Sequence, residues 1–192
     1  MRRLLTENLP WRPKGRVEAS DPEEKLPRAS FVIATLILFS LSSAVAAPAA
    51  GEYAKHFDAL NKLSVAVAQA MPPDQYGFRP RPESMTFGEL MGHIASTNYQ
   101  FCAGLKDTDP PAMPAPTDKD GYVKFLSDSF EYCAKVIPTL TTEQMEHTHD
   151  SPDGTLPGRE VLLAMYIHVA HHRGQAEIYL RDKGIRPPSY RI

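Results

Sequence analysis

Three histidines stand within five residues near the carboxyl end of the chain, in the stretch HVAHHRGQAEIYLR. They are His168, His171 and His172, and the spacing of the neighbouring apolar residues predicts a helix. On that helix His168 and His172 project from successive turns of one face, while His171 lies to the side. Histidines at i and i+4 can hold a divalent metal ion, because both imidazoles reach one point. His171 remains an alternative to His172, since positions i and i+3 also share a face.

The third ligand of such a site is not decided by spacing. A catalytic zinc-type site takes three protein ligands and keeps a further position open. His93, in FGELMGHIASTN, lies on the flank of another apolar stripe, where a lone histidine is more often a half-buried packing residue. His147 and His149, in the polar segment EHTHDSPDG, are expected to be solvated, with a second surface metal site as the alternative. His56 is expected on the surface of the first helix.

Four amphipathic segments are available to position these histidines. Their apolar residues recur at helical spacing, and they cover approximately residues 51–71, 86–105, 119–140 and 159–183. Thr86 and Glu89 have the spacing of a capping box, and Gly184 supplies a helix stop. Proline-rich joints separate the segments, and no run alternates as a strand would. The pattern predicts an all-α fold, a four-helix bundle.

The amino-terminal part has the pattern of a leader. An apolar run at residues 31–47 follows Arg28 and ends in small residues, with Ala44, Val45 and Ala46 forming an A-x-A cleavage site. We therefore expect residues 1–46 to be a leader with a signal peptide, whose apolar region is 31–46, and residues 47–192 to be the bundle domain. A retained membrane anchor is the alternative, although a transmembrane helix needs about 20 apolar residues. Cleavage predicts a periplasmic or secreted protein with no membrane attachment.

The charge and the cysteines constrain the function further. The leader removes seven basic and five acidic residues, so the mature chain keeps 14 basic and 18 acidic residues, a net charge of −4. A nucleic-acid-binding protein would show a basic face, and we expect no nucleic-acid partner.

Cys102 and Cys133 lie on different expected helices. They could pair in an oxidising compartment or remain two small buried side chains, and the sequence does not decide between these alternatives.

Two stretches, YGFRPRPESMTFGELMGHI and MYIHVAHHRGQAEIYLR, together resemble the DinB-like superfamily of four-helix metal-binding proteins. The resemblance covers approximately residues 53–181. In that family a histidine on the second helix and an H-x-x-x-H pair on the fourth converge at one end of the bundle. The resemblance implies that His93, His168 and His172 bind a divalent metal ion such as Zn or Ni, and that the protein can form a homodimer.

Other residues near the histidines have two interpretations each. A metal-bound imidazole usually donates its other N–H to a carboxylate, a carbonyl or water. Glu89 is one candidate for such a contact, with helix capping as its alternative. Gln175 and Tyr179 share the stripe of His168 and His172 and could line the open position, with helix packing as their alternative.

The expected chemistry follows from three neutral imidazoles, which leave a bound metal ion its full positive charge. Water or a thiol bound there loses a proton near neutral pH. The resemblance and this chemistry together favour a metal-dependent hydrolase or a thiol-dependent transferase acting on a small molecule. A non-enzymatic metal-binding or stress-related protein is the alternative, and the sequence leaves the question of an enzyme open. Export disfavours the thiol route, because low-molecular-weight thiols are held reduced in the cytosol while the periplasm is oxidising.

Overall fold

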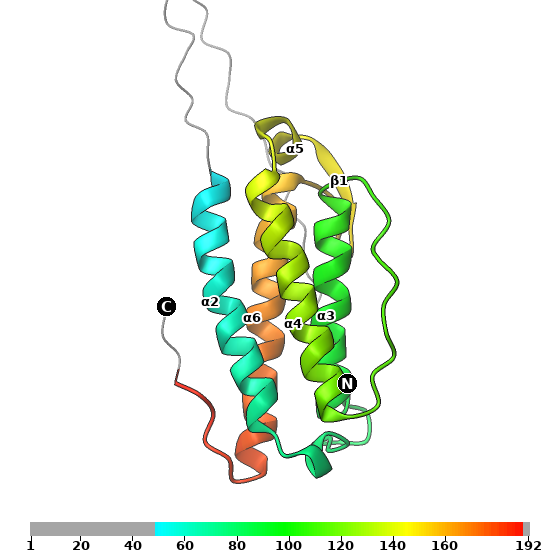
Figure 1. The fold of residues 1–192 in the computed structure, drawn as a ribbon, viewed down its shortest axis with the longest axis vertical. Helices are drawn as coiled ribbons and strands as arrows, with labels where there is room; N and C mark the ends of the chain where they lie inside the picture. Colours follow the sequence, from blue (N-terminus) through cyan, green and yellow to red (C-terminus); the bar gives the residue numbers. More distant parts are fainter. Residues whose placement is uncertain (1–48, 190–192) are drawn as a thin grey trace, which may run out of the picture. The chain divides into compact units, whose positions relative to one another are not determined.

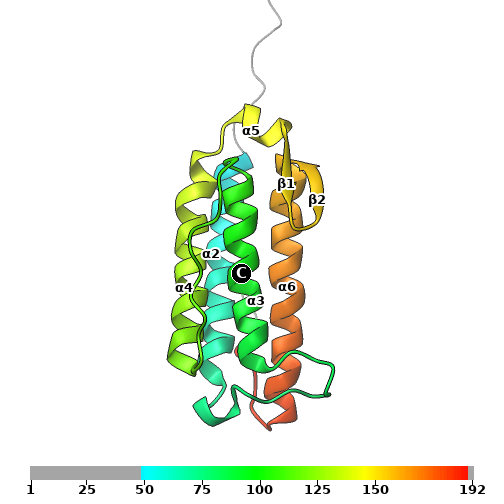
Figure 2. The same ribbon diagram turned by 90° about the vertical axis from the view of Figure 1, so that its right-hand side faces the viewer.

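Four long helices form a bundle in the structure, a computed structural model that describes residues 49–189 (Figures 1 and 2). They are α2 (Ala49–Ala70), α3 (Phe87–Gly104), α4 (Lys119–Val136) and α6 (Gly158–Asp182). α3 and α4 run in one direction and α2 and α6 in the other, so that the connection of residues 105–118 returns along the length of the bundle (Figure 1). The all-α bundle expected from the sequence is confirmed.

Local signals in the sequence set several of the helix ends. The Thr86 side chain accepts a hydrogen bond from the Glu89 backbone N–H at 3.1 Å, and the Glu89 carboxylate accepts one from the Thr86 N–H at 2.7 Å. This is the predicted capping box at the start of α3. Asp118 caps α4 by accepting from the Gly121 N–H at 2.8 Å. After α6 the backbone turns at Gly184, whose φ of 71° suits glycine.

The core lies between the four helices and is rich in aromatic side chains. α3 contacts both α4 and α6, and α2 contacts the same two helices. The largest fully buried side chains include Phe57, Phe87, Phe101 and Phe130, one or two from each of α2, α3 and α4. α6 adds Val161, Leu162, Met165, Val169 and Leu180, which are all fully buried. This shared apolar interior fixes how α3 and α6 face each other.

Cys102 of α3 and Cys133 of α4 form a disulfide, which decides between the two alternatives that the sequence left open. Their Cα atoms lie 5.6 Å apart, within the usual range for a disulfide, and both residues are fully buried. The parallel course of α3 and α4 brings the two cysteines to the same level of the bundle although 31 residues separate them. The bond joins these two helices covalently.

The segment between α4 and α6 is more ordered than the sequence indicated. It begins with a short 3₁₀ turn, η2 (Ile137–Thr139), and then forms the short helix α5 (Thr142–Glu146) and two antiparallel strands. A second 3₁₀ turn, η1 (Pro73–Gln75), lies between α2 and α3. The strands are β1 (Thr148–Ser151) and β2 (Gly154–Pro157). No strand was expected, because each strand has only four residues and neither shows a regular alternation of apolar and polar side chains.

The expected solvation of His149 is wrong. This side chain is 1% exposed on β1, with Nδ1 2.9 Å from Asp107 Oδ1 and Nε2 2.6 Å from the Gln144 carbonyl oxygen. The hairpin lies against the end of α3, where a side chain at Gly104 would stand 2.4 Å from the Asp150 carbonyl oxygen. The absence of a side chain at Gly104 thus lets the hairpin, which carries His149, pack closely against the end of α3. His147 and His56 are exposed, as expected.

One side of α6 exposes apolar side chains to solvent. Leu163, Ile167 and Ile178 are each more than half exposed, and their spacing places them along a single stripe. Beside this stripe a groove of about 290 Å³ runs between α2 and α6 and is lined by His56, Ala59, Leu60, Leu63, Tyr166, Ile167 and Ala170. We call the three exposed residues the α6 apolar stripe. A homodimer could cover it, and the expected homodimer stays a prediction.

The leader expected at residues 1–46 lies outside the described residues. Among the helices of residues 49–189, none combines the length and the apolar character that a membrane span requires. Signal cleavage and export therefore also stay predictions.

Candidate metal centre

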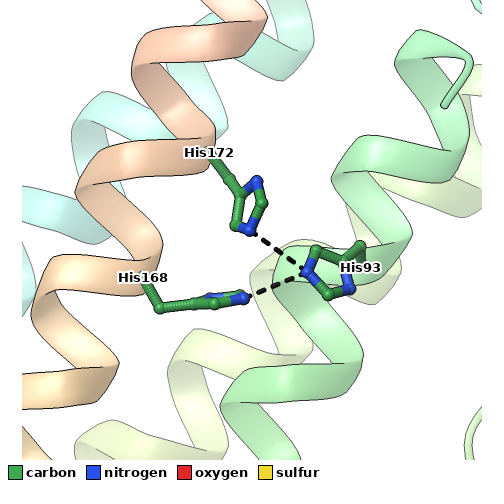
Figure 3. A group of neighbouring side chains, drawn as sticks. All are labelled: His93, His168 and His172. Carbon is green, nitrogen blue, oxygen red and sulfur yellow. Dashed lines mark hydrogen bonds between the residues drawn. The ribbon is translucent and has the colours of Figure 1, made fainter. Parts of the chain in front are cut away.

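Three histidine side chains from two helices converge between α3 and α6 (Figure 3). His93 Nε2 lies 3.0 Å from His168 Nε2 and 3.2 Å from His172 Nε2. One nitrogen of each ring lies within 4.8 Å of the others, and all three residues are half-buried. We call His93, His168 and His172 the histidine triad. The structure thus brings together the three residues that the resemblance implied as ligands.

Their position in the bundle differs from one expectation. The resemblance implied convergence at one end of the bundle. His93 is instead the seventh of the 18 residues of α3, and His168 is the eleventh of the 25 residues of α6. The triad therefore lies near the middle of both helices. α6 supplies two members from successive turns, and the packing of α3 against α6 supplies the third.

His171 does not take part in the cluster. It is exposed, and its Nε2 lies 3.0 Å from the side-chain nitrogen of Gln175. His172, rather than His171, faces His93. Spacing alone left this alternative open, and the direction from which α3 approaches α6 decides it.

The donor set fits a divalent metal ion. Tetrahedral ligands about 2.0–2.1 Å from zinc stand about 3.3 Å from each other, and the separations of 3.0 and 3.2 Å are close to that value. Three uncharged ring nitrogens that point at one another bring their lone pairs close together. A cation between them removes the repulsion between these lone pairs. In residues 49–189 no carboxylate joins the three nitrogens, so the donor set is imidazole alone. Imidazole suits Zn, Ni, Cu and Fe.

Burial keeps all three rings ready to act as ligands. Burial lowers the pKa of His93 and the pKa of His172 below the usual histidine value. Burial, together with the neighbouring imidazoles, lowers the pKa of His168 to about 4. The rings are therefore neutral at pH 7, and a neutral imidazole is the form that binds metal.

The two α6 histidines are held in different ways. His172 Nδ1 lies 2.8 Å from Gln175 Oε1. His168 packs against Phe101, with ring centroids 5.9 Å apart, and its buried Nδ1 has no hydrogen-bond partner among the described residues. Polar contact thus orients His172, and apolar packing orients His168.

The other candidates near the site have structural contacts. The Glu89 carboxylate serves the capping box and lies 3.5 Å from Arg79 Nη2, which favours the capping interpretation. The Tyr179 hydroxyl donates to the Met85 carbonyl at 3.0 Å, and its ring packs against Phe78. Gln175 is the candidate that does contact the triad, through His172.

Comparisons with known proteins indicate a single family. The family model of the DinB superfamily matches residues 56–176. An uncharacterized protein of Bacillus subtilis, YjoA, is 24% identical over 134 residues, which are 67% of this chain and 87% of YjoA. The crystal structure of YjoA, a DinB-like protein, has a TM-score of 0.63 and 25% identity, and covers 73% of this chain and 98% of its own.

A second crystal structure shows the same fold. A DinB-like protein from Bacillus cereus ATCC 10987 has a TM-score of 0.63 at 15% identity, and covers 72% of this chain and 95% of its own. At that identity the likeness is one of fold.

Proposed function

The chain belongs to the DinB superfamily, and from this premise we propose that it is a divalent-metal-binding protein whose ligands are His93, His168 and His172. The observation that supports the proposal is the convergence of three half-buried ring nitrogens from α3 and α6. For the ion we propose Zn or Ni, which both accept imidazole ligands. Three protein ligands leave a coordination position open to a small molecule.

For the activity we propose metal-dependent hydrolysis of a small molecule. A divalent ion on three neutral imidazoles keeps its full charge and lowers the pKa of a water or thiol that binds to it toward neutrality. The chain's own residues hold the ion, keep their rings uncharged through burial and keep one ring in position through Gln175. A thiol-dependent transferase is the second enzymatic candidate.

The disulfide bears on the choice between these two reactions. A buried disulfide between Cys102 and Cys133 is typical of a protein that folds in an oxidising compartment. We propose export to the periplasm or the medium after cleavage of residues 1–46. Reduced low-molecular-weight thiols are scarce there, which favours hydrolysis over thiol transfer. Fractionation of cells and mass spectrometry of the amino terminus test export, and intact chain recovered from the cytoplasm would contradict it.

A metal-binding protein without turnover is the alternative. It is favoured by the all-imidazole donor set, because within residues 49–189 no carboxylate joins the triad as a general base. Enzymes of this kind often carry such a base. A role in metal binding or stress would require only that the ion be held.

Two measurements test the proposed function. Elemental analysis of the purified protein should find about one metal ion per chain after incubation with Zn or Ni. The metal should be lost in His93→Ala and in His172→Ala, while the control His171→Ala should keep it. A wild type that stays metal-free would overturn the proposal.

The metal-loaded protein should then be assayed on a panel of small esters and amides. Hydrolysis that disappears in His168→Ala supports the enzyme. Stoichiometric metal with no turnover across the panel would favour the binding protein. For the transferase, a cobalt-substituted protein should change its absorption spectrum when a small thiol is added, and an unchanged spectrum would exclude that reaction.

A further inference from the structure

Gln175 bridges one member of the histidine triad and the exposed histidine beside it. Its side-chain oxygen lies 2.8 Å from His172 Nδ1, and its side-chain nitrogen lies 3.0 Å from His171 Nε2. All three residues belong to α6, and their spacings of three and four residues place them on neighbouring turns. Gln175 is half-buried, and its amide lies between His172 of the triad and the exposed His171.

This bridge decides which nitrogen of His172 carries the proton. An amide oxygen only accepts hydrogen bonds, and an amide nitrogen only donates them. His172 Nδ1 must therefore carry the hydrogen that it donates to Gln175 Oε1. In a neutral imidazole the other nitrogen is then unprotonated. This nitrogen is Nε2, which faces His93 at 3.2 Å and is the atom that would bind the metal.

His171 holds the other end of the same amide. Its Nε2 lies 3.0 Å from the Gln175 side-chain nitrogen and accepts a hydrogen bond from it when His171 is in the Nδ1–H tautomer, which favours the amide orientation that turns Oε1 toward His172. A reversed amide would present a donor to His172 Nδ1, and His172 Nε2 would then carry the proton. An exposed histidine outside the cluster thus contacts the same amide as a residue inside it.

Resting on the proposed metal-binding function, we propose that Gln175 is a positioning residue that keeps His172 in the Nδ1–H tautomer, and that His171 anchors the Gln175 amide. Contacts of this kind to the far nitrogen of a metal-binding histidine fix its orientation, and their loss typically costs about 10–100-fold in metal affinity. His168 has no such contact among the described residues. Gln175 therefore affects metal affinity through one ring, that of His172.

The test uses the full chain and Zn²⁺ in competition with a chromophoric chelator. Gln175→Leu should weaken Zn²⁺ binding by about 10–100-fold, because leucine cannot accept the His172 proton. Gln175→Glu should bind within a few-fold of the wild type, since a carboxylate accepts the same N–H. His171→Ala should weaken binding by no more than a few-fold, because the Gln175 oxygen can still accept the His172 proton. The matched control is Gln69→Leu, which replaces an exposed glutamine on α2.

A second readout does not depend on metal. Long-range ¹H–¹⁵N spectra of the metal-free protein distinguish the two histidine tautomers. His172 should be the Nδ1–H tautomer in the wild type and in Gln175→Glu, and should shift toward Nε2–H or a mixture in Gln175→Leu. This readout remains decisive if Gln175→Leu is too unstable for titration, because the wild-type spectrum alone can contradict the proposal.

The outcomes separate the inference from the proposed function. If Gln175→Leu binds Zn²⁺ as tightly as the wild type, or if His172 of the wild type is the Nε2–H tautomer, the inference is wrong and the metal site stands. If the wild type binds neither Zn²⁺ nor Ni²⁺, the proposed function fails, and the spectrum of the metal-free protein alone then decides whether Gln175 holds His172 in the Nδ1–H tautomer.

Discussion

Metal binding should raise the thermal stability of the bundle, because the triad exists only when α3 and α6 are packed together. His93 and His168 are 75 residues apart in the chain. The unfolded chain therefore does not hold the three imidazoles together, and the ion binds mainly to the folded state. The perturbation is the addition of Zn²⁺ to the metal-free protein, followed by calorimetry of thermal unfolding.

The size of the shift can be worked out from linkage. At a free Zn²⁺ concentration 100 times the Kd, binding stabilises the folded state by about 2.7 kcal/mol. For a domain of this size, about 1 kcal/mol raises Tm by about 4 °C, so the expected shift is about 10 °C. His168, His171 and His172 lie close together in sequence and can bind some Zn²⁺ in the unfolded chain, which would reduce the shift.

Two variants show whether the ion joins α3 to α6. Each is compared with its own metal-free form, so that differences in starting stability cancel. His93→Ala should lose most of the shift, since α6 alone then supplies the ligands. The matched control, His171→Ala, should keep most of it. A shift in His93→Ala as large as in the wild type would refute the view that the ion joins α3 to α6.

Three further results are expected. Replacing both Cys102 and Cys133 by alanine should lower the free energy of unfolding by about 3–4 kcal/mol, as expected for a loop of 31 residues, and an unchanged urea midpoint would contradict this. Burial lowers the pKa of His149, but hydrogen bonds to a backbone carbonyl and to Asp107 outweigh it and leave this pKa raised. The folded state then holds the His149 proton more tightly than the unfolded chain does. The contribution of this proton to the free energy of unfolding is complete below the unfolded pKa of 6.5 and is lost as the pH rises through the folded pKa. Urea midpoints of the wild type should show this loss, and those of His149→Gln should not. Ile167→Lys should convert a homodimer into monomers in light scattering, because it places a charge in the α6 apolar stripe, and a monomeric wild type would show that the stripe is not a dimer interface.

The helices could be predicted from the sequence because their signals are local. The capping box at Thr86 and Glu89, the stop at Gly184 and the apolar periods all act within a few residues. The i, i+4 spacing of His168 and His172 is also a local signal. The residues alone did not identify His93 as the third member, because its role depends on how α3 packs against α6, and only the family resemblance indicated it.

The features that were missed depend on contacts between distant residues. His149 contacts Asp107, which lies 42 residues earlier in the chain, and it belongs to a hairpin too short to show a strand period. The disulfide, which the sequence left open as one of two alternatives, depends on the parallel course of α3 and α4, which follows from the long connection between them. The bridge through Gln175 was also hidden, since its spacing fits helix packing equally well.

The disulfide and the histidine triad form nested loops in the chain. The 31-residue loop closed by Cys102 and Cys133 lies inside the 75-residue span from His93 to His168. Once the disulfide has formed, the path between those histidines shortens to about 44 residues, and the entropic free-energy cost of closing the outer loop falls by about 0.5 kcal/mol at room temperature. This reduction is small compared with the free-energy cost of closing either loop. The disulfide and a metal ion bound at the triad would therefore act almost independently, and a chain that lacks one of them would gain little help from the other.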